Sequence, residues 1–558
     1  MRLPSLAGCL LALAAGVDGS APATSSPADE RRFDVVVYGG TSAGVIAGIQ
    51  ARRMGRSVVL LEPGQHLGGL SSGGLGNTDI GNKGAIGGLA RTFYERVARH
   101  YERPEAWVHE TREEYRARSR IDNQGHERPD PLVERTSVPT MWVFEPSVAE
   151  GIFRAMAEEA GLSVHFGQRL DFDGGVEKEG TTLGSARMES GRVYAGRVFI
   201  DASYEGDLMA KAGVSYAVGR EGNDVYGETL NGVQTNNATN HQFQVRVDPY
   251  RVPGQPESGL LPGLHAGGPG AEGSGDRRVQ AYNFRLTLTD APANRLPIPR
   301  PEGYDPLRYE LLRRYIERGV FDALELNSPM PNRKTDVNNH GAFSSDHIGA
   351  NDDYPDGDWP TRERIFRDHV SYVMGLWHFL QTDPRLPGEV RSAAGRWGLC
   401  RDEFADNGHW PHQMYVREAR RMVNDHVMTE HHCRGDRRAE DAVGLAAYGM
   451  DSHNTQRYVA EGAARNEGNV EVGVPGPYPV SYRSIVPRRS EATNLLVPVA
   501  LAASHIAYGS IRMEPVFMML GQSAATAASL ALDGRGVVQD VRYEALRERL
   551  LSDGQILE

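Results

Sequence analysis

The sequence is poor in cysteine. Its 558 residues include three cysteines, and Cys9 lies in an N-terminal apolar stretch, so Cys400 and Cys433 remain for the folded protein. No Cys-x-x-Cys or Cys-x4-Cys pair is present, which argues against a thiol redox centre. The two remaining thiols could form one disulfide in an oxidising compartment or stay free and buried. No zinc site is expected at His431, His432 and Cys433, because adjacent side chains point apart and no second ligand pair follows.

Basic residues are outnumbered, and long apolar runs are missing beyond the N-terminus. Lys and Arg total 61 against 73 Asp and Glu, giving a net charge of −12. This balance argues against nucleic acid and anionic membrane surfaces as partners. No segment after the leader reads as a stable membrane span. The apolar content of 40% and charged content of 24% are those of an ordinary globular protein.

The N-terminus reads as an export signal. Arg2 precedes an apolar stretch over residues 6–16, and small residues and a Ser/Pro-rich spacer follow. We therefore predict a signal peptide and a secreted or periplasmic protein. The tetrapeptide ending at Cys9 imitates a lipoprotein cleavage box. However, most of the apolar run follows Cys9, so ordinary cleavage near Ala21 or Ala23 is favoured over lipid anchoring.

Residues 33–62 form the most informative pattern in the chain. A β-branched run is followed by a glycine-rich turn, a helix of small residues, a second strand and an acidic residue. These pieces are residues 35–37, 39–44, 45–54 and 57–61, and Glu62. The order is typical of a dinucleotide-binding unit, and the alternative is a βαβ crossover without a ligand.

Each part of this unit has a physical role. Gly39 permits the tight turn, and Gly44 lets the helix lie close on the strand. The N–H groups at the helix start can hold a pyrophosphate, and the carboxylate of Glu62 can accept both ribose hydroxyls. Thr41 replaces the middle glycine of the usual pattern, and its side chain narrows the approach of the phosphate. The predicted cofactor-binding residues of the unit are Gly39, Gly40, Thr41, Ser42, Ala43, Gly44 and Glu62.

The rest of the chain divides into an α/β part and an inserted cap. Residues 66–88 contain too many glycines for a helix or strand and suit a loop around a flat ligand. Helices are expected at 89–101, 145–160, 364–381 and 513–532, and strands at 163–166, 185–189, 193–200 and 494–500. The predicted division is a signal peptide (1–21), a linker (22–32), a dinucleotide-binding domain in two pieces (33–218, with an insertion about 90–140, and 437–540), a cap or substrate region (219–436) and a C-terminal helix or tail (541–558).

Three separated segments resemble FAD-dependent oxidoreductases of the glutathione-reductase-like superfamily. They are the N-terminal unit, VFIDASYEGDLMAKAGV at 198–214, and the stretch from NLLVPVA at 494 to the helix at 513–532. The chain is most similar to the secreted FAD-dependent oxidoreductase family, whose members open with YGGTxAG and HLGG. The resemblance implies an α/β fold with a discontinuous Rossmann-like FAD-binding domain, an inserted mixed α+β cap, and FAD as cofactor. It also implies that Gly68, Gly69 and Asp201 contribute to the cofactor site.

One departure from the superfamily concerns the flavin ribitol. The Gly-Asp that usually ends the C-terminal strand aligns with Val499 and Ala500. The ribitol must then be held by Ser504 or by backbone N–H groups at the helix start near Met513. His66 follows the ribose acid, where the succinate dehydrogenase group carries a histidyl–flavin bond. Noncovalent binding is the favoured interpretation.

The catalytic candidates gather near the C-terminal helix and in the cap. His505 is the first choice for acid/base work, since an imidazole titrates near neutral pH, and a structural role at a helix start is the alternative. Arg512 could clamp a carboxylate or stabilise reduced flavin, or simply pair with Glu514. Tyr508 could donate to a substrate oxygen or only pack.

A second cluster lies in the cap at Tyr448, Asp451 and His453. Asp451 could orient His453 as a base only on extended or turn backbone, because positions i and i+2 do not face each other on a helix. The charges at Arg417 and Glu418, with Arg420 and Arg421, are more typical of a solvated or ion-paired face. Thr78 and Asp79, in the glycine-rich loop, could touch the flavin or the substrate.

Three functions remain compatible with the sequence. The first is a secreted oxidoreductase that transfers a hydride from an alcohol or amine carbon of a small molecule or carbohydrate to FAD, with an undefined electron acceptor. The second is a lyase acting on a carboxylated sugar with structural FAD, and the third is a flavin-binding protein without turnover. An NAD(P)H-dependent reductase is disfavoured, because we find one good dinucleotide unit and no redox cysteine pair.

Overall fold

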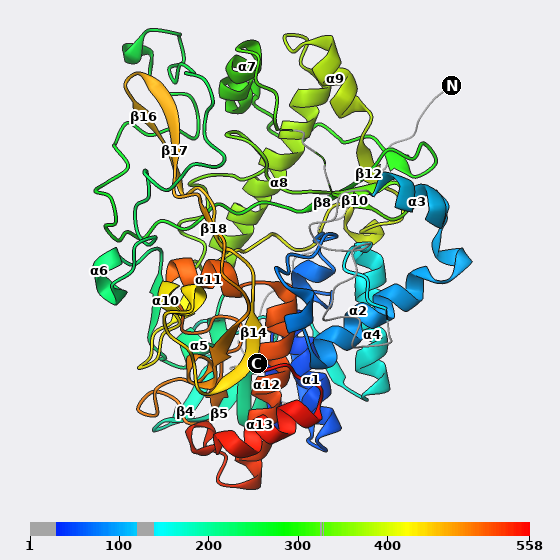
Figure 1. The fold of residues 1–558 in the computed structure, drawn as a ribbon, viewed down its shortest axis with the longest axis vertical. Coiled ribbons are helices and arrows are strands. Elements are labelled where there is room, and N and C mark those ends of the chain that lie inside the picture. Colours follow the sequence, from blue (N-terminus) through cyan, green and yellow to red (C-terminus); the bar gives the residue numbers. More distant parts are fainter. Residues whose placement is uncertain (1–29, 120–138, 324–325, 327) are drawn as a thin grey trace, which may run out of the picture.

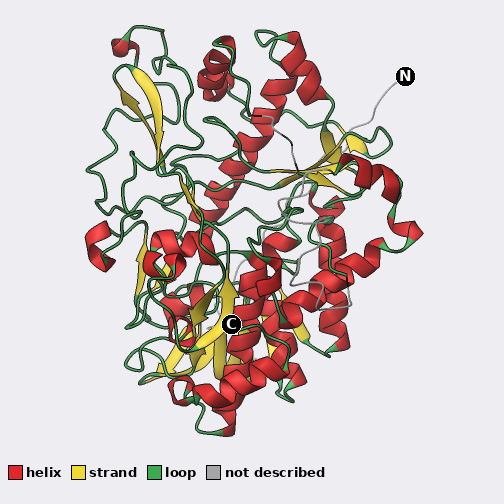
Figure 2. Cartoon of the chain, viewed as in Figure 1, coloured by secondary structure: helices red, strands yellow, loops and turns green. Residues whose placement is uncertain are grey.

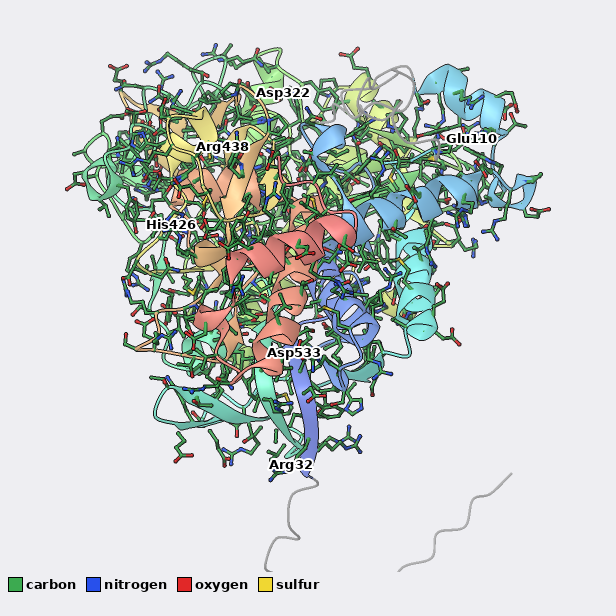
Figure 3. The ribbon with its side chains drawn as sticks, turned by 60° about the horizontal axis from the view of Figure 1, so that its bottom comes forward. Arg32, Glu110, Asp322, His426, Arg438 and Asp533 are labelled. Carbon is green, nitrogen blue, oxygen red and sulfur yellow. The ribbon has the colours of Figure 1, made fainter. Side chains whose placement is uncertain are left out.

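The computed structural model describes residues 30–119, 139–323, 326 and 328–558. The predicted leader with Cys9, and part of the predicted insertion about 90–140, lie outside these residues. In Figure 1 the sheet and its helices occupy the lower half of the molecule, and the cap lies above them. In Figure 3 Arg32, near the start of the chain's first strand, and Asp322, in the cap, lie at opposite ends. The predicted α/β fold with an inserted cap is therefore confirmed.

The lower half is built on one mixed sheet (Figure 2). Its order is β3-β2-β1-β6-β5-β4, with β20 also pairing with β6. Strands β3, β2, β1, β6 and β20 run parallel, and β5 and β4 continue antiparallel. The strands are β1 (Glu30–Tyr38), β2 (Val58–Glu62), β3 (Ser163–Phe166), β4 (Val176–Glu179), β5 (Thr182–Arg187), β6 (Val193–Asp201) and β20 (Leu495–Leu496).

The alternation of side chains along β1 assigns its two faces. Val35 and Val37 join the core that includes helices α1 and α12, whereas Val36 and Tyr38 join a second core on the opposite face. Because both faces are covered there, the buried second half of the strand, residues 35–38, carries no charged side chain. The helices of this half are α1 (Ser42–Arg53), α2 (Gly88–Tyr101), α4 (Pro146–Glu159), α5 (Asp207–Lys211), α11 (His505–Ile511), α12 (Glu514–Asp533) and α13 (Tyr543–Ser552), whereas α3 (Arg112–Arg118) lies beside the cap strands in Figure 1.

Helix α12 lies in the centre of this half. Its length and its mean hydropathy of 1.3 suit a membrane span, contrary to our expectation that no segment after the leader would, and it is the only such helix among the residues described by the structure. Of the most apolar 18-residue stretch of α12, 94% is buried inside the protein. The apolar character of α12 is thus explained by its packing against α1.

The strand predicted at 494–500 is mostly wrong. Only Leu495–Leu496 pair with β6. From Val497 the backbone bonds to other segments, because Val497 N–H donates to Ile485 and the carbonyl of Ala500 accepts from Met422. Tertiary hydrogen bonds therefore replace the sheet ladder in a segment whose apolar sequence alone reads as a strand.

The cap is a five-stranded sheet flanked by helices. The sheet order is β10-β11-β8-β12-β9, and the long helix α8 crosses the upper half in Figure 1. Two strands at the start and near the end of the predicted cap region, β7 and β13, form one antiparallel pair. The cap elements are β7 (Tyr216–Val218), α6 (Asn223–Tyr226), β8 (Leu286–Thr289), β9 (Arg295–Leu296), α7 (Glu310–Glu317), β10 (Pro329–Met330), β11 (Lys334–Val337), α8 (Trp359–Thr382), α9 (Gly388–Gly395), β12 (Gly398–Cys400), β13 (Arg420–Met422) and α10 (Glu430–Arg434).

Part of the segment 437–540 lies with the cap rather than with the FAD-binding pieces where we placed it. Hairpin β16–β17 stands in the upper half of Figure 1, and Ala464 N–H donates to the carbonyl of Val247. The hairpin therefore extends the cap. The strands of this segment are β14 (Ala442–Ala446), β15 (Met450–Ser452), β16 (Gln456–Ala460), β17 (Ala463–Glu467), β18 (Val470–Val472) and β19 (Tyr478–Ser481).

Cys400 and Cys433 are buried free thiols, so they form no disulfide. Burial raises the pKa of both thiols, and that of Cys433 rises to about 12. The Cys433 Sγ lies 3.3 Å from the hydroxyl of Tyr478. Both residues are therefore packed, protonated side chains with low nucleophilicity.

A buried ion cluster joins the two halves. The carboxylate of Asp207 in α5 accepts from Arg362 of α8 at 2.7 and 2.8 Å and from Arg420 of β13 at 2.7 Å. We expect Asp207→Asn to destabilise the protein by about 3–5 kcal/mol, because two buried guanidinium groups lose the carboxylate that they share and Arg420 keeps only its pair with Asp356. The measurement is the apparent thermal unfolding midpoint. Asp171→Asn, which breaks an exposed pair with Arg187, should cost under about 1 kcal/mol; equal shifts would contradict the prediction.

Candidate cofactor and active site

A cavity of about 450 Å³ opens where β1 and β2 end. This is the edge at which parallel α/β sheets bind ligands. Its walls come from the turn after β1, the loop after β2, the turn after β6 and the cap. The wall residues include Gly39, Thr41, Glu62, Gly64, His66, Gly69, Arg169, Ser203, Tyr204, Glu205, Tyr354, Trp359, His412, Gln413 and Met414.

Glu62 is held in a fixed orientation at the cavity wall. Its Oε2 accepts from the N–H of Gly40 at 2.6 Å, and its Oε1 accepts from the N–H of Gly64 at 2.5 Å. Burial raises the pKa of Glu62 to about 7, although the two N–H groups act in the opposite direction. A Cβ on Gly40 would lie 2.7 Å from Oε2, so the carboxylate needs a glycine there. The arrangement suits a ligand with two neighbouring hydroxyls.

The side chain of Thr41 is committed to the fold. Its hydroxyl donates to the carbonyl of Ala202 at 2.7 Å and accepts from the N–H of Gly44 at 3.3 Å, which caps α1. The threonine therefore ties the turn to the end of β6. Ser42 and Ala43 follow as the first buried residues of α1.

Two glycines bring the next loop against the turn. Gly68 and Gly69 have φ values of 102° and 55°, which favour glycine. The N–H of Gly68 donates to the carbonyl of Gly40 at 2.8 Å. A Cβ on Gly69 would lie 2.3 Å from the hydroxyl of Tyr204. The loop can thus approach the cavity only without side chains at these positions.

Asp201 and Ser504 are used within the fold rather than at the cavity wall. Asp201 accepts from the N–H groups of Ser203 and Met209 at 3.0 and 2.8 Å and so fixes the turn after β6. Burial raises its pKa to about 6. Ser504 caps α11, and its hydroxyl donates to Glu228 at 2.6 Å. Neither side chain lines the cavity described above.

His66 stacks on His412 at the edge of the cavity. The ring centroids are 3.8 Å apart and the planes differ by 9°. Its Nδ1 lies 3.1 Å from Glu150 and its Nε2 lies 3.5 Å from Asp406. The hydrogen bond with Glu150 raises the pKa of His66. Each ring nitrogen therefore faces a carboxylate, an arrangement that accounts for this histidine without a covalent bond.

His505 is fully enclosed in an ion network. Its Nδ1 lies 2.7 Å from Glu418 and its backbone N–H donates to Glu221 at 3.0 Å. Burial opposes ionisation of Glu418, yet the charges of His505 and Arg421 lower its pKa to about 2. Tyr508, one helical turn on, is also enclosed, and burial raises its pKa. This geometry favours a structural role for both.

His453 has a different setting. Its Nδ1 lies 2.7 Å from Asp346 Oδ2, while Nε2 lies 3.7 Å from Asp451 Oδ2, beyond hydrogen-bond distance. Asp346 also accepts from Arg417 at 2.9 Å. Burial disfavours the charged form of Asp346, but Arg417 and His453 hold its pKa below the ordinary value. An ionised carboxylate can only accept, so Nδ1 carries the hydrogen that faces Asp346, and Nε2 is the ring nitrogen that is left to exchange a proton.

Arg512 connects Asp451, the neighbour of His453 in this cluster, to Tyr415. It donates to the hydroxyl of Tyr415 at 2.6 Å and to the carbonyl of Asp451 at 3.0 Å, and Met414, next to Tyr415, lines the cavity. The predicted pairing of Arg512 with Glu514 is wrong. Glu514 instead accepts from the hydroxyls of Tyr204 and Ser71.

The charge run at 417–421 is ion-paired and buried rather than solvated. Arg417 bonds to Asp346, Arg420 to Asp207, and Arg421 to Glu418. The sequence did not reveal Asp346, the partner of His453, or the buried pair of Arg285 with Asp336. In each case the tertiary fold brings together residues that are distant in sequence. The sequence also did not reveal the aromatic cap wall of Tyr354 and Trp359.

The fold and cavity define an α/β protein with a dinucleotide site between a Rossmann-like domain and a cap. The chain belongs to the FAD dependent oxidoreductase family, whose model matches residues 34–550. It is accordingly an FAD-dependent oxidoreductase, and FAD is its cofactor. No functionally curated protein matches the chain significantly.

Solved structures offer local similarity. Flavin-dependent brominase Bmp2 is 17% identical over 34% of this chain and 42% of that one, with a TM-score of 0.22. L-Amino acid deaminase from Proteus vulgaris is 17% identical over 38% of this chain and 54% of that one, with a TM-score of 0.23. Anhydrotetracycline hydroxylase OxyS from Streptomyces rimosus is 16% identical over 39% and 38%, with a TM-score of 0.22. The alignments span less than two thirds of each of those proteins.

Proposed function

We propose that this flavoenzyme is exported and oxidises an alcohol or amine carbon of a small molecule or carbohydrate. The observation that carries the proposal is the imidazole of His453, which Asp346 orients through Nδ1 in a cluster that also holds Asp451 and Arg512. Bound FAD supplies the two-electron acceptor for the hydride. Export is supported by the apolar leader pattern at residues 6–16.

In this reaction separate residues bind the cofactor and accept the substrate proton. With FAD bound, Glu62 would hold its ribose hydroxyls, and the turn that the glycines at 39, 68 and 69 keep free of side chains would hold its phosphates. His453 Nε2 takes the proton of the substrate O–H or N–H. The imidazolium that forms lies between Asp346 and Asp451, whose negative charges stabilise it.

Glu62 makes cofactor binding pH-dependent. Its pKa is about 7, and an ionised carboxylate accepts ribose hydroxyls better than a neutral one. FAD affinity should therefore rise as the pH rises through 7 and level off above it, since binding releases the proton. We expect Glu62→Gln to weaken FAD binding by about tenfold to a hundredfold and to flatten the pH profile. Fluorescence titration of apoprotein with FAD measures both, and a profile unchanged by Glu62→Gln would contradict the assignment.

The test of the proposed reaction is anaerobic bleaching of the bound flavin. We expect an amine or alcohol donor to reduce the holoenzyme, and oxygen or another acceptor to restore the oxidised spectrum. A substrate that yields double-bond absorbance without bleaching would instead establish a lyase. Failure of every alcohol and amine donor to bleach the flavin would overturn the proposal.

A further inference from the structure

One segment of the cap, residues 404–414, supplies part of the wall of the cofactor cavity. We call it the cap loop. Its wall residues are Asp406, Asn407, His412, Gln413 and Met414. The start of the loop is fixed, because the buried carboxylate of Glu403 accepts from Lys334 at 2.7 Å and from the N–H of Ser147 in α4 at 2.9 Å. The cap therefore borders the cavity through a segment that is anchored on both halves of the molecule.

Two residues of the cap loop have left-handed backbone although neither is glycine. The φ values are 51° for Phe404 and 64° for His409, a region that residues with a side chain rarely adopt. The N–H of His409 donates to the carbonyl of Phe404 at 2.8 Å, and its Nδ1 lies 3.2 Å from the carbonyl of Glu403. Such conformations persist only where the surrounding structure maintains them, and they are concentrated at ligand sites.

His412 carries two polar atoms that the fold does not use. Both of its ring nitrogens are buried, and neither has a hydrogen-bond partner among the residues that the structure describes. Burial lowers the pKa of His412 to about 4, and the charge of His66 acts in the same direction. The ring is therefore neutral near pH 7, with one N–H and one lone pair. Leaving both without a partner costs free energy.

Packing does not account for a histidine at this position. The ring of His412 stacks on His66 with the centroids 3.8 Å apart, and it meets the ring of Phe404 edge-on at 5.7 Å. A phenyl ring would make the same two contacts without burying polar atoms. The ring of His66 differs, because each of its nitrogens faces a carboxylate. The nitrogens of His412 therefore indicate a partner in the cavity that the ring borders.

The chemistry of the imidazole selects the kind of partner. An ionised phosphate only accepts hydrogen bonds and would satisfy the N–H alone, whereas a hydroxyl can serve either nitrogen. FAD carries hydroxyls on its ribose and on its ribitol. We propose that His412 is a cofactor-binding residue supplied by the cap, and that its ring nitrogens form hydrogen bonds with hydroxyl groups of bound FAD. The inference concerns the cofactor and does not depend on the proposed substrate or base.

The test is the FAD affinity of His412→Phe, measured by fluorescence titration of the apoprotein. Phenylalanine keeps the ring that stacks on His66 and removes both nitrogens. We expect FAD to bind about tenfold more weakly. The apparent unfolding midpoint of the apoprotein should stay the same or rise, because two buried polar atoms are gone. His378→Phe, on helix α8 and outside the cavity wall described above, should leave FAD affinity unchanged.

Titration with ADP identifies the hydroxyls. Weaker binding of both ADP and FAD to His412→Phe assigns His412 to the ribose, and weaker binding of FAD alone assigns it to the ribitol. Unchanged FAD affinity in His412→Phe would overturn the inference. If that variant does not fold, His412→Gln and His412→Leu decide the question, because the two side chains are similar in size and only glutamine has a donor and an acceptor. Equal FAD affinity of these two would also overturn it. Neither titration requires turnover, so failure of the proposed oxidation would leave both results unchanged.

Discussion

His453→Gln should slow anaerobic flavin reduction by about 10²- to 10⁴-fold, the range that a positioned general base contributes. Glutamine keeps a polar side chain near Asp346 but cannot take the substrate proton. The bound flavin should keep its oxidised spectrum and its affinity, because His453 lies beyond the cavity rather than in its wall. Stopped-flow absorbance with the best donor measures the rate.

Further variants distinguish a catalytic role of His453 from a structural one. Asp346→Asn should lower the same rate less than His453→Gln and displace its pH profile, since it removes the orienting charge from Nδ1. His431→Gln, in α10 and outside the cluster, should leave the rate unchanged. If His505→Gln slows reduction more than His453→Gln at equal FAD content, the base is His505, and the assignment made here is wrong.

The sequence predicted the parts of the fold that depend on local pattern. The first strand and the helix after it end within one residue of the predicted ends. β-Branched residues favour the strand, glycines permit the tight turn, and small residues favour the helix. Helix α4, expected at 145–160, spans Pro146–Glu159 for the same reason. The end of strand β20 after Leu496 could not be predicted, because the backbone of residues 497–500 bonds to segments that are distant in sequence.

The candidate site was only partly predictable. Glu62 follows from its place after the second strand, and the structure puts it in the cavity wall. Asp451 lies in strand β15, as its proposed pairing with His453 requires, and His453 follows the last residue of that strand. The partner that orients His453 is Asp346, however, which is 107 positions away in sequence. No spacing rule connects residues that only the cap fold brings together.

Gly44→Ala should produce the largest loss of cofactor and stability. A Cβ at this position would lie 1.8 Å from the carbonyl oxygen of Gly39, far inside van der Waals contact. Helix α1 would have to move away from the turn, and its N–H groups would leave the phosphate position. We expect purified protein with little or no FAD and a destabilisation of about 3 kcal/mol or more.

The matched control is another helical glycine with open space around it. Gly151 in α4 has no heavy atom within 4 Å of an added Cβ, so Gly151→Ala should stabilise the protein by about 0.5–1 kcal/mol and leave FAD content unchanged. Flavin absorbance per protein and the apparent unfolding midpoint measure both variants. Full FAD content in Gly44→Ala would mean that the turn relaxes around the methyl group, and that close approach of α1 to the turn is not what holds the cofactor.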